Sequence, residues 1–379
     1  MHEKKIYDAC IIGGGLSGLS LSIQLAKLGY TVALFEKEIY PFHKVCGEYI
    51  SFESWNFLEE LGYPLSEFEL PIINKLTVSA PNGTLLQQDL PLGGFGISRY
   101  KLDNGLKDIA LLNKVHVFDN CKVHEVEFVN EIFQLKTTNG QYVCSICCGS
   151  FGKRSNLDVK WNRRFINSKP NKLDNYMAVK YHININQPTD TIALHNFKDG
   201  YCGISKIEGN RYCLCYLTNA QNLKKSNNSI EKMEKNILYK NPHLKKIFTS
   251  CKNLYDSPVT ISQISFNKKT QVENHVLLIG DAAGMITPLC GNGMSMALHG
   301  SKLATALIDN FLKNKISRQQ LEKEYCITWK KTFGKRLQYG RFIQSLFGKT
   351  WITNMFIAIL KTMPAITKKL IRQTHGDPF

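Results

Sequence analysis

The first forty residues alternate between apolar runs and glycines in a way that predicts a strand, a helix and a second strand. Residues 6–12 are mostly apolar and end in three glycines. Residues 16–29 place apolar side chains such as Leu19 and Ile23 at helical spacing, and residues 31–36 are again nearly all apolar. Buried parallel strands have this composition, so the pattern predicts a complete βαβ unit.

Later segments alternate more strictly between apolar and polar positions, which is typical of half-buried strands. Two hairpins are predicted, around turns at 81–83 and 208–210, before a buried strand at 275–279 and a long helix at 294–312. This order predicts an α/β protein in which a Rossmann-like domain is interrupted by an antiparallel-sheet domain and followed by a helical C-terminus. The expected bounds are 1–75, 99–165 and 255–318 for the first domain, 76–98 and 166–254 for the second, and 319–379 for the basic helical region.

The composition fits a globular chain of two lobes. The chain has 379 residues, of which 43% are hydrophobic and 21% charged, so it can form two cores and is too apolar for disorder. Lys and Arg exceed Asp and Glu by 48 − 31 = 17, an excess that fits an anionic ligand or a membrane surface as well as nucleic acid. Because no nucleic-acid motif accompanies the charge, we expect no nucleic-acid partner.

The 12 cysteines are expected to be reduced thiols of a cytoplasmic protein, because the chain opens on charged residues and a strand instead of a leader segment. Cys144, Cys147 and Cys148 lie close together without the paired spacing of a zinc site, so no metal site is predicted. The longest apolar stretch near the C-terminus, residues 350–360, is too short to span a membrane.

The first glycine loop has the spacing GxGxxG between a predicted strand and a predicted helix, which is the context this motif requires. Glycines let the backbone approach a pyrophosphate, and the helix N-terminus faces its negative charge. An acid ends the next strand, where its carboxylate is placed to accept ribose hydroxyls. The predicted dinucleotide contacts are Gly13, Gly15, Leu16, Ser17, Gly18, Glu36 and Lys37.

A second glycine-rich segment, GDAAG at 280–284, follows the buried strand at 275–279. A carboxylate at the tip of a buried strand needs polar partners, and a turn capped by this aspartate is the simpler alternative to a ligand site. The sequence GNGM at 291–294 then opens a helix and exposes backbone N–H groups to an electron-rich ligand. The predicted contacts here are Gly280, Asp281, Gly291, Asn292, Gly293 and Met294.

Together, GxGxxG with Glu36 and GDAAG with GNGM resemble the FAD-dependent monooxygenases of the aromatic-hydroxylase fold, and within them the geranylgeranyl reductase-like branch. The resemblance runs from Asp8 to about Leu312. It implies a GR2-type FAD-binding domain with an inserted antiparallel-sheet substrate domain. It also implies that the first loop holds the FAD pyrophosphate, Glu36 the adenosine ribose, Asp281 the ribityl chain and phosphate, and the 291–294 loop the flavin ring.

Three further segments carry the resemblance. Arg99 matches an arginine that reaches FAD, and Val123 matches a strand whose backbone lies against adenine. The sequence CGE at 46–48 matches a motif close to the flavin, which implies flavin contacts by Cys46 and Gly47. The alternatives are a surface arginine that opens a helix for Arg99 and a small buried apolar side chain for Cys46.

Departures from the family pattern bear on the reaction. Phe151 stands where the family has an aspartate implicated in flavin and nicotinamide handling, and Gly203 replaces a tryptophan over the substrate. The tryptophan pair and lysine motif of flavin halogenases are missing, which argues against halogenation. Because no second GxGxxG is present, NADH or NADPH is expected at most as a transient reductant.

Two flavin reactions fit the sequence. The resemblance favours a monooxygenase that hydroxylates a lipophilic or aromatic small molecule through a flavin C4a-hydroperoxide. The alternatives are a reductase of alkene bonds in a polyprenyl or other lipid, and a flavin-binding protein without turnover. No general acid or base is assigned: Cys46 and Tyr201 are the catalytic candidates, whereas His182 and His195 on strands are expected to be structural.

The C-terminal region carries apolar residues at helical spacing among basic ones. These are Phe342, Leu346, Phe347, Trp351, Met355, Ile359 and Leu360. A basic amphipathic helix fits a membrane surface and a lipophilic substrate, and the alternative is that this face covers the catalytic lobe. The expected location is therefore cytoplasmic, with peripheral membrane association as a further possibility, and the sequence indicates no oligomeric state.

Overall fold

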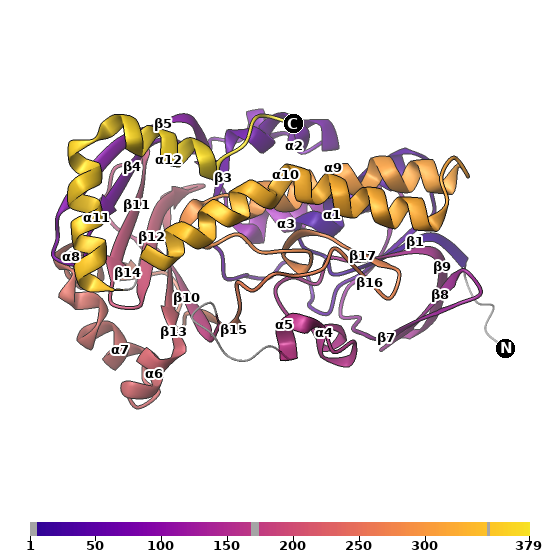
Figure 1. Ribbon diagram of the computed structural model, residues 1–379, viewed down its shortest axis with the longest axis horizontal. Helices are drawn as coiled ribbons and strands as arrows, with labels where there is room; N and C mark the ends of the chain where they lie inside the picture. The colour runs from indigo at the N-terminus through magenta and orange to yellow at the C-terminus, as the bar shows by residue number, and fades with distance from the viewer. Residues whose placement is uncertain (1–5, 168–173, 347–348) are drawn as a thin grey trace.

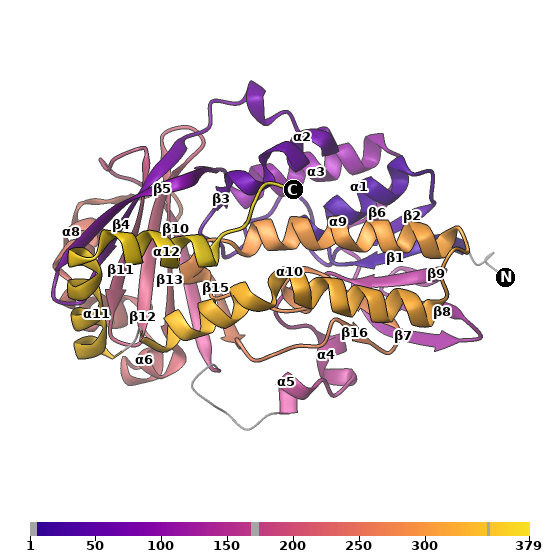
Figure 2. The ribbon, with the colours of Figure 1, turned by 45° about the horizontal axis from the view of Figure 1, so that its top comes forward.

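Two β-sheets organise the structure, one toward each end of its long axis, and two long helices run along that axis (Figures 1 and 2). The computed structural model describes residues 6–167, 174–346 and 349–379. We use "first lobe" for the part built on the sheet that contains the chain's opening strand, and "second lobe" for the part built on the other sheet.

The sheet of the first lobe has a parallel core that begins with the predicted βαβ unit. β1 (Ile6–Ile12) pairs in parallel with β2 (Val32–Phe35) and with β9 (Gly140–Gly149), and α1 (Leu16–Lys27) connects β1 to β2. β9 also pairs in parallel with β17 (Val276–Leu278). The chain therefore returns late to the first lobe, as predicted. The other strands of this sheet are β6 (His116–Phe118), β7 (Val123–Val129), β8 (Ile132–Thr137) and β16 (Val272–Glu273).

Three helices pack together beside this parallel core: α1, α3 (Arg99–Leu112) and α9 (Gly293–Leu312). Every residue of β2 is buried, which matches the continuous apolar run that predicted it. A small hydroxyl contact joins two of the helices, because Ser20 Oγ of α1 donates to Ser301 Oγ of α9 at 2.7 Å. Small side chains allow helices to approach closely, so α9 is held against the glycine loop at the start of α1.

The second sheet is mostly antiparallel and contains both predicted hairpins. Its strand order is β14-β10-β13-β12-β11-β4-β5-β3, and β15 pairs with β10. One exception to the antiparallel pattern is the parallel pairing of β11 with β4. The strands are β3 (Tyr49–Ser51), β4 (Ile72–Ser79), β5 (Leu85–Gly96), β10 (Tyr176–Asn184), β11 (Thr191–Phe197), β12 (Gly200–Ile207), β13 (Arg211–Asn219), β14 (Lys252–Asn253) and β15 (Val259–Ile264).

Side chains alternate between the two faces of this sheet. On β10, Met177, Val179 and Ile183 join a hydrophobic core with α7 (Ile230–Asn236) and α8 (Pro242–Ser250). The intervening residues of β10 therefore project from the opposite face, and their contacts below are with loops of the first lobe. The remaining helices are α2 (Trp55–Leu61), α4 (Asn156–Lys160), α5 (Arg164–Asn167) and α6 (Ala220–Lys225).

The pairing of strands differs from the expected domain bounds in three places. β3 and residues 72–75 of β4 belong to the second sheet, although residues 1–75 were expected in the first domain. β15 also pairs in the second sheet, although 255–318 was expected in the first domain. In each case the sequence of the strand does not indicate which strand it pairs with. Sheet membership is decided by tertiary pairing and not by local composition.

The C-terminal region is helical, as predicted. α10 (Arg318–Leu346) lies beside α9 along the long axis, and α11 (Thr350–Thr362) and α12 (Pro364–Thr374) lie over the second lobe (Figures 1 and 2). Ile357 and Leu360 of α11 are buried against residues of β4 and β5, so one face of α11 covers the second sheet. The predicted residue Phe347 lies outside the described residues.

Candidate functional site

The first glycine loop is a tight turn between β1 and α1. Gly13 has a φ of +106°, a conformation that favours glycine. At Gly18 a Cβ atom would lie 2.0 Å from the carbonyl oxygen of Gly13, so the helix and the turn can approach only without a side chain there. The geometry of the turn therefore explains why glycine stands at these two positions, with or without a ligand.

Gly15 has a different environment, because two cations face it. A Cβ atom on Gly15 would lie 3.6 Å from Nη2 of Arg99 and 3.7 Å from Nζ of Lys44. Asp103 holds both cations: it accepts two hydrogen bonds of 2.7 Å from Arg99 and lies 3.1 Å from Lys44 Nζ. We call this arrangement the cation cradle (Gly15, Lys44, Arg99 and Asp103). Positive charge at the N-terminus of α1 suits an anionic group such as a pyrophosphate.

The carboxylate predicted to bind ribose is buried at the end of β2. Glu36 Oε2 accepts the N–H of Gly14 at 2.8 Å, and Oε1 accepts the N–H of Glu38 at 3.1 Å. These bonds fix its direction beside the glycine loop. The side chain of Lys37 is instead 65% exposed and pairs with Glu38, so the structure places this predicted contact at the surface.

Val123 lies near Glu36. It is buried at the start of β7, and its carbonyl oxygen accepts Asn156 Nδ2 at 3.3 Å. The N–H of Cys121, two residues earlier, donates to the carbonyl of Glu36 at 2.8 Å. The backbone here is therefore beside Glu36, and the contact of Val123 with adenine stays a prediction.

The second glycine-rich segment meets the first one in space. Gly280 has a φ of +63°, and a Cβ atom on it would lie 2.7 Å from Oγ of Ser17 in α1. Asp281 follows, half-buried, and its carbonyl oxygen accepts Lys269 Nζ at 2.8 Å. Burial lowers the pKa of Lys269 to about 8, against the raising effect of Asp281. Two motifs far apart in the sequence thus form one continuous edge.

A buried ion pair supports this edge from behind. Arg163 Nη1 donates to Asp158 Oδ1 at 2.6 Å and to the carbonyl of Ala282 at 3.1 Å. The side chains of Arg163 and Asp158 are 1% and 0% exposed. Sequence patterns did not single out these residues, because neither belongs to a recognised motif and the two become partners only in the fold.

The 291–294 loop meets the CGE segment. Gly291 has a φ of +66°, and Met294, at the start of α9, has its Sδ 3.5 Å from Cys46 Sγ. The side-chain amide of Asn292 donates to Thr374 at the end of α12. Residues 46–48 and 291–294 therefore lie together beside the cradle, and the sequence predicted that both contact the same flavin ring.

Comparisons with known proteins agree with this geometry. A sequence profile of the NAD(P)-binding Rossmann-like domain matches residues 11–46, and a profile of squalene epoxidase matches residues 204–343. Conditioned medium factor receptor 1 of Dictyostelium discoideum is 25% identical over 361 residues, which are 88% of this chain and 69% of that protein.

Two solved structures resemble the whole chain. The flavin-dependent brominase Bmp2 has a TM-score of 0.80 at 17% identity, with 98% of this chain and 93% of that chain covered. A geranylgeranyl bacteriochlorophyll reductase-like protein from Thermoplasma acidophilum has a TM-score of 0.79 at 17% identity, with 99% and 97% covered. The chain has the fold of the FAD-dependent monooxygenases. The predicted α/β architecture with a Rossmann-like FAD-binding lobe is therefore confirmed.

The residues of the first lobe fit FAD. The cation cradle suits the pyrophosphate, Glu36 suits the ribose, and the Cys46–Met294 contact lies where the resemblance puts the isoalloxazine ring. α9 begins without a side-chain cap, so its first N–H groups are available to an electron-rich ligand. Among the described helices, none is both long and apolar enough to cross a membrane.

One face of the second sheet is turned toward this FAD site. Ser205 Oγ of β12 donates to the carbonyl of Gly47 at 3.3 Å, and Cys213 Sγ of β13 lies 3.2 Å from the carbonyl of Cys46. By strand alternation the same face carries the half-buried Gly203 and Cys215. The loop 44–48 therefore runs between the first-lobe loops and the sheet, and it leaves Gly203 and Cys215 as a small-residue floor.

Tyr201, one of the two catalytic candidates, is 5% exposed and packs with Leu217, Met285 and Leu289. Burial raises the pKa of Tyr201 well above its ordinary value, so the phenol stays neutral. Cys46, the other candidate, is half-buried beside Met294. The structure thus places Cys46 beside the 291–294 loop, and it places Tyr201 among apolar side chains on the face of β12 that also carries Gly203.

Phe151, which replaces the family's aspartate, is half-buried over the end of β9. A Cβ atom on Gly149 would lie 2.5 Å from its ring, and the ring also lies edge-on to Trp161. An apolar side chain occupies this position because small and aromatic neighbours surround it. No carboxylate replaces the missing aspartate at this position.

A buried charged cluster that the sequence did not reveal lies at the junction of the lobes. Glu48, the last residue of the CGE segment, is fully buried and contacts Lys180 and His182 of β10. His182 had been expected to be structural. The pairing crosses more than a hundred residues of chain, so local patterns carried no signal for it beyond the strand alternation that puts Lys180 and His182 on one face.

Proposed function

We propose that the protein is an FAD-dependent monooxygenase that acts on a lipophilic or aromatic small molecule. One observation carries the proposal. The small-residue floor at Gly203 and Cys215 faces the cation cradle and the Cys46–Met294 contact. The squalene epoxidase profile supports it, because residues 204–343 include the second half of β12, all of β13 and the 291–294 loop.

The chain's own residues bind and orient in this proposal. Arg99 and Lys44 hold the pyrophosphate, and Glu36 holds the adenosine ribose. When bound, FAD supplies the redox chemistry. The floor of the second sheet holds the substrate and, with the 44–48 loop, excludes water from the junction of the lobes. Replacement of a tryptophan by Gly203 leaves more room over the flavin than the reductase pattern does.

Product mass spectrometry tests the reaction type. Purified protein is reduced and incubated with aromatic and polyprenyl substrates, with and without oxygen. A product that gains one oxygen atom and requires air supports the monooxygenase. A product that gains two hydrogen atoms without air contradicts it and supports reduction of an alkene, the reaction class of the second candidate.

Two other functions remain as candidates. The reductase is favoured by the likeness to the geranylgeranyl bacteriochlorophyll reductase-like structure and by the CGE segment. A flavin-binding protein without turnover is favoured by the relative named as a receptor. Bound flavin that no chemical or nicotinamide donor reduces would identify the last case.

We also propose NADH or NADPH as a transient reductant. The Rossmann-like profile at 11–46 supports a dinucleotide site, and in this proposal FAD fills the site at the first glycine loop. Phe151 removes the carboxylate expected to help a nicotinamide, so we expect slow reduction. Stopped-flow bleaching of the flavin by each nicotinamide donor measures it.

A lipophilic substrate agrees with a second proposal, that α11 docks on an anionic membrane surface. Trp351, Met355 and Ile359 are 67%, 51% and 47% exposed and recur every four residues, so they share the outward face of α11. The inward face, with Ile357 and Leu360, covers the second sheet. Opposite faces of α11 therefore suit the two alternatives for the tail, and Leu360 lies on the inward face.

Charge supports the same surface. Residues 325–376 contain no acidic residue. The basic residues in this stretch are Lys330, Lys331, Lys335, Arg336, Arg341, Lys349, Lys361, Lys368, Lys369 and Arg372. An apolar stripe flanked by basic side chains suits the headgroup region of an anionic bilayer.

Vesicle sedimentation tests the surface. The protein should bind vesicles that contain phosphatidylserine and should not bind pure phosphatidylcholine, and Trp351→Ser with Ile359→Ser should weaken binding. The matched control is Ile327→Ser, which removes an apolar side chain that is 55% exposed on α10. Equal binding by the double variant and the wild type would contradict the proposal.

A further inference from the structure

The buried cluster at the junction of the lobes is centred on one carboxylate. Glu48 Oε1 accepts from Lys180 Nζ at 2.5 Å and from the backbone N–H of Arg99 at 2.8 Å. Glu48 Oε2 lies 2.6 Å from His182 Nε2. Burial alone would raise the pKa of Glu48, but the hydrogen bond from His182 and the charge of Lys180 lower it to about 2. Glu48 is therefore ionised at neutral pH.

An ionised carboxylate fixes the protonation of the imidazole. Because Glu48 can only accept, the hydrogen of His182 must sit on Nε2. The other ring nitrogen, Nδ1, is buried and has no hydrogen-bond partner among the described residues. An unpartnered buried polar atom costs free energy, which calls for a reason other than packing.

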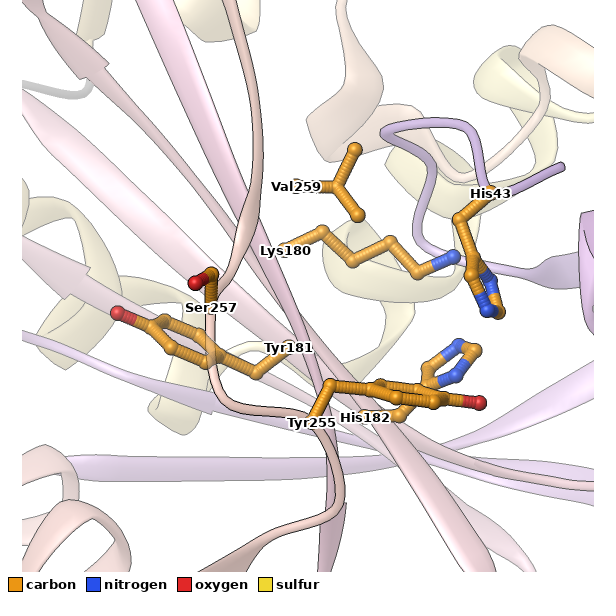
Figure 3. A pocket seen from close by; sticks show the side chains of 7 residues that line it. All are labelled: His43, Lys180, Tyr181, His182, Tyr255, Ser257 and Val259. Atoms are coloured by element: carbon orange, nitrogen blue, oxygen red, sulfur yellow. The ribbon is translucent and has the colours of Figure 1, made fainter.

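His182 borders a small hollow. Figure 3 shows the rings of His43 and Tyr255 turned toward His182, with the Lys180 side chain reaching toward His43. The ring centroids of His43 and Tyr255 lie 5.2 and 5.7 Å from that of His182. Tyr255 is 45% exposed, so the hollow leads outward. It is also lined by Ser257, Val259 and Tyr181.

The same cluster connects inward to the FAD site. Lys180 Nζ donates to the carbonyl of Lys44 at 3.0 Å, and Lys44 belongs to the cation cradle. On the ladder, Lys180 stands opposite Cys215 of the substrate floor. A chain of hydrogen-bonding groups therefore runs from the hollow to the junction of the lobes.

A metal ion is a poorer explanation of the cluster. Glu48, His182 and Cys213 bring three potential ligand atoms within 4.8 Å of one another. The ammonium of Lys180 already lies against the carboxylate, and burial raises the pKa of the Cys213 thiol. A metal ion bound here would therefore lie beside the Lys180 ammonium and the neutral thiol of Cys213.

We propose that His182, positioned by Glu48, is the proton-transfer residue through which the FAD site exchanges protons with solvent. The proposal deepens the proposed function and rests on it, because flavin reduction and reoxidation consume and release protons.

The transfer balances without any change in electrons. Lys180 gives its proton to an acceptor at the junction. As Nδ1 of His182 takes a proton from the hollow, Nε2 passes its proton to Glu48 Oε2. Rotation of the Glu48 carboxyl group then turns this proton toward Lys180, which takes it and leaves the carboxylate ionised again. Return of the His182 tautomer resets the path. One proton moves inward, and the reverse sequence moves one outward.

The charged and titratable groups that face His182 come from several elements. They are Glu48 and His43 of the 43–48 loop, Lys180 of β10, Arg211 and Cys213 of β13, and Tyr255 of the 254–258 loop. The pKa of His43 is lowered mostly by burial, and then by Lys180 and His182. His43 therefore stays neutral and does not compete for the proton.

Nitrogen-15 NMR of the histidine side chains tests the resting state without any turnover. The expected result for the wild type at neutral pH is a protonated Nε2 and an unprotonated Nδ1 at His182. Glu48→Gln should disturb this tautomer. A proton found on Nδ1 of the wild-type residue would overturn the proposal, whether or not the protein has the proposed function.

Proton uptake after flash photoreduction of the bound flavin tests the path. His182→Gln keeps an amide donor for Glu48 but cannot pass a proton, so flavin bleaching should be unchanged and dye-detected proton uptake about a hundred-fold slower. His195→Gln is the matched control: His195 is a buried histidine on β11 that bonds Ser79 at 2.9 Å, and uptake should keep its wild-type rate.

Imidazole rescue separates proton transfer from a purely structural clamp. Added imidazole should accelerate uptake in His182→Ala and leave His182→Gln unchanged. Wild-type uptake in His182→Gln, or slow uptake in His182→Ala without rescue, would overturn the proposal. Failure of the proposed function looks different, because bound flavin would then exchange protons normally and yield no product.

Discussion

Replacing Gly15 with alanine should separate folding of the first glycine loop from binding of FAD. Gly15 has φ −88° and ψ −173°, a conformation that alanine adopts freely. The added Cβ would meet only Arg99 and Lys44, at 3.6 and 3.7 Å, which is ordinary contact. The methyl group would instead occupy the space between the cations and the N-terminus of α1, where the pyrophosphate is expected.

The magnitudes follow from these contacts. A Gly→Ala change at a compatible backbone position leaves folding stability the same or raises it by about 0.4–1 kcal/mol. Loss of one charge-assisted hydrogen bond to the pyrophosphate costs about 1.5–3 kcal/mol, which weakens FAD binding about ten- to a hundred-fold. Gly18→Ala is the matched control, because its Cβ would lie 2.0 Å from the carbonyl of Gly13 and destabilise the fold by about 1–3 kcal/mol or more.

Two measurements distinguish the variants. Urea unfolding of the apoproteins should show a normal midpoint for Gly15→Ala and a lowered one for Gly18→Ala. Quenching of flavin fluorescence on titration with FAD should show the weakened affinity of Gly15→Ala. An unchanged FAD affinity for Gly15→Ala would refute the placement of the pyrophosphate in the cation cradle, and a lowered midpoint would refute the claim that Gly15 is free of steric conflict.

Three further outcomes are expected. Arg163→Met should lower stability by about 3–5 kcal/mol, because it leaves the buried Asp158 unpaired; a urea midpoint equal to that of the wild type would contradict this. Glu48 has a pKa lowered from 4.5 to about 2, so its stabilisation is full above pH 4.5 and is lost as pH falls toward 2. Acid unfolding of Glu48→Gln should therefore differ least from the wild type at the lowest pH. Burial lowers the pKa of His195 from 6.5 to about 3, so stability should fall as pH drops from 6.5 toward 3. In a pH series of melting temperatures, His195→Gln should make this fall in the melting temperature smaller.

The cofactor loops could be predicted from sequence because their signals are local. Gly13, Gly15 and Gly18 follow a strand and open a helix within one short segment, and Glu36 ends the next strand. The pairings that hold these loops were not predicted, for the opposite reason. Asp103 and Lys44 stand in segments that carry the resemblance, but their ion pair joins separate elements. Arg163 reaches the second loop from a segment without a motif.

The junction of the lobes shows the same limit. Strand alternation puts Lys180 and His182 on one face, but only the fold brings Glu48 to them. The expected domain bounds differ from the sheet pairing for a related reason, since β15 has little pattern of its own and pairs with β10. Local composition specifies elements, whereas distant partners specify sheets and buried charges.

The late return of the chain to the first lobe has a consequence for biosynthesis. β9 must pair with β17, and Gly280 must reach Ser17, before the FAD edge exists. Such contacts between distant parts of the sequence form slowly. A nascent chain released before residue 281 therefore exposes the flank of β9 and cannot trap the cofactor, so FAD capture should follow completion of most of the polypeptide and act as a late checkpoint of its folding.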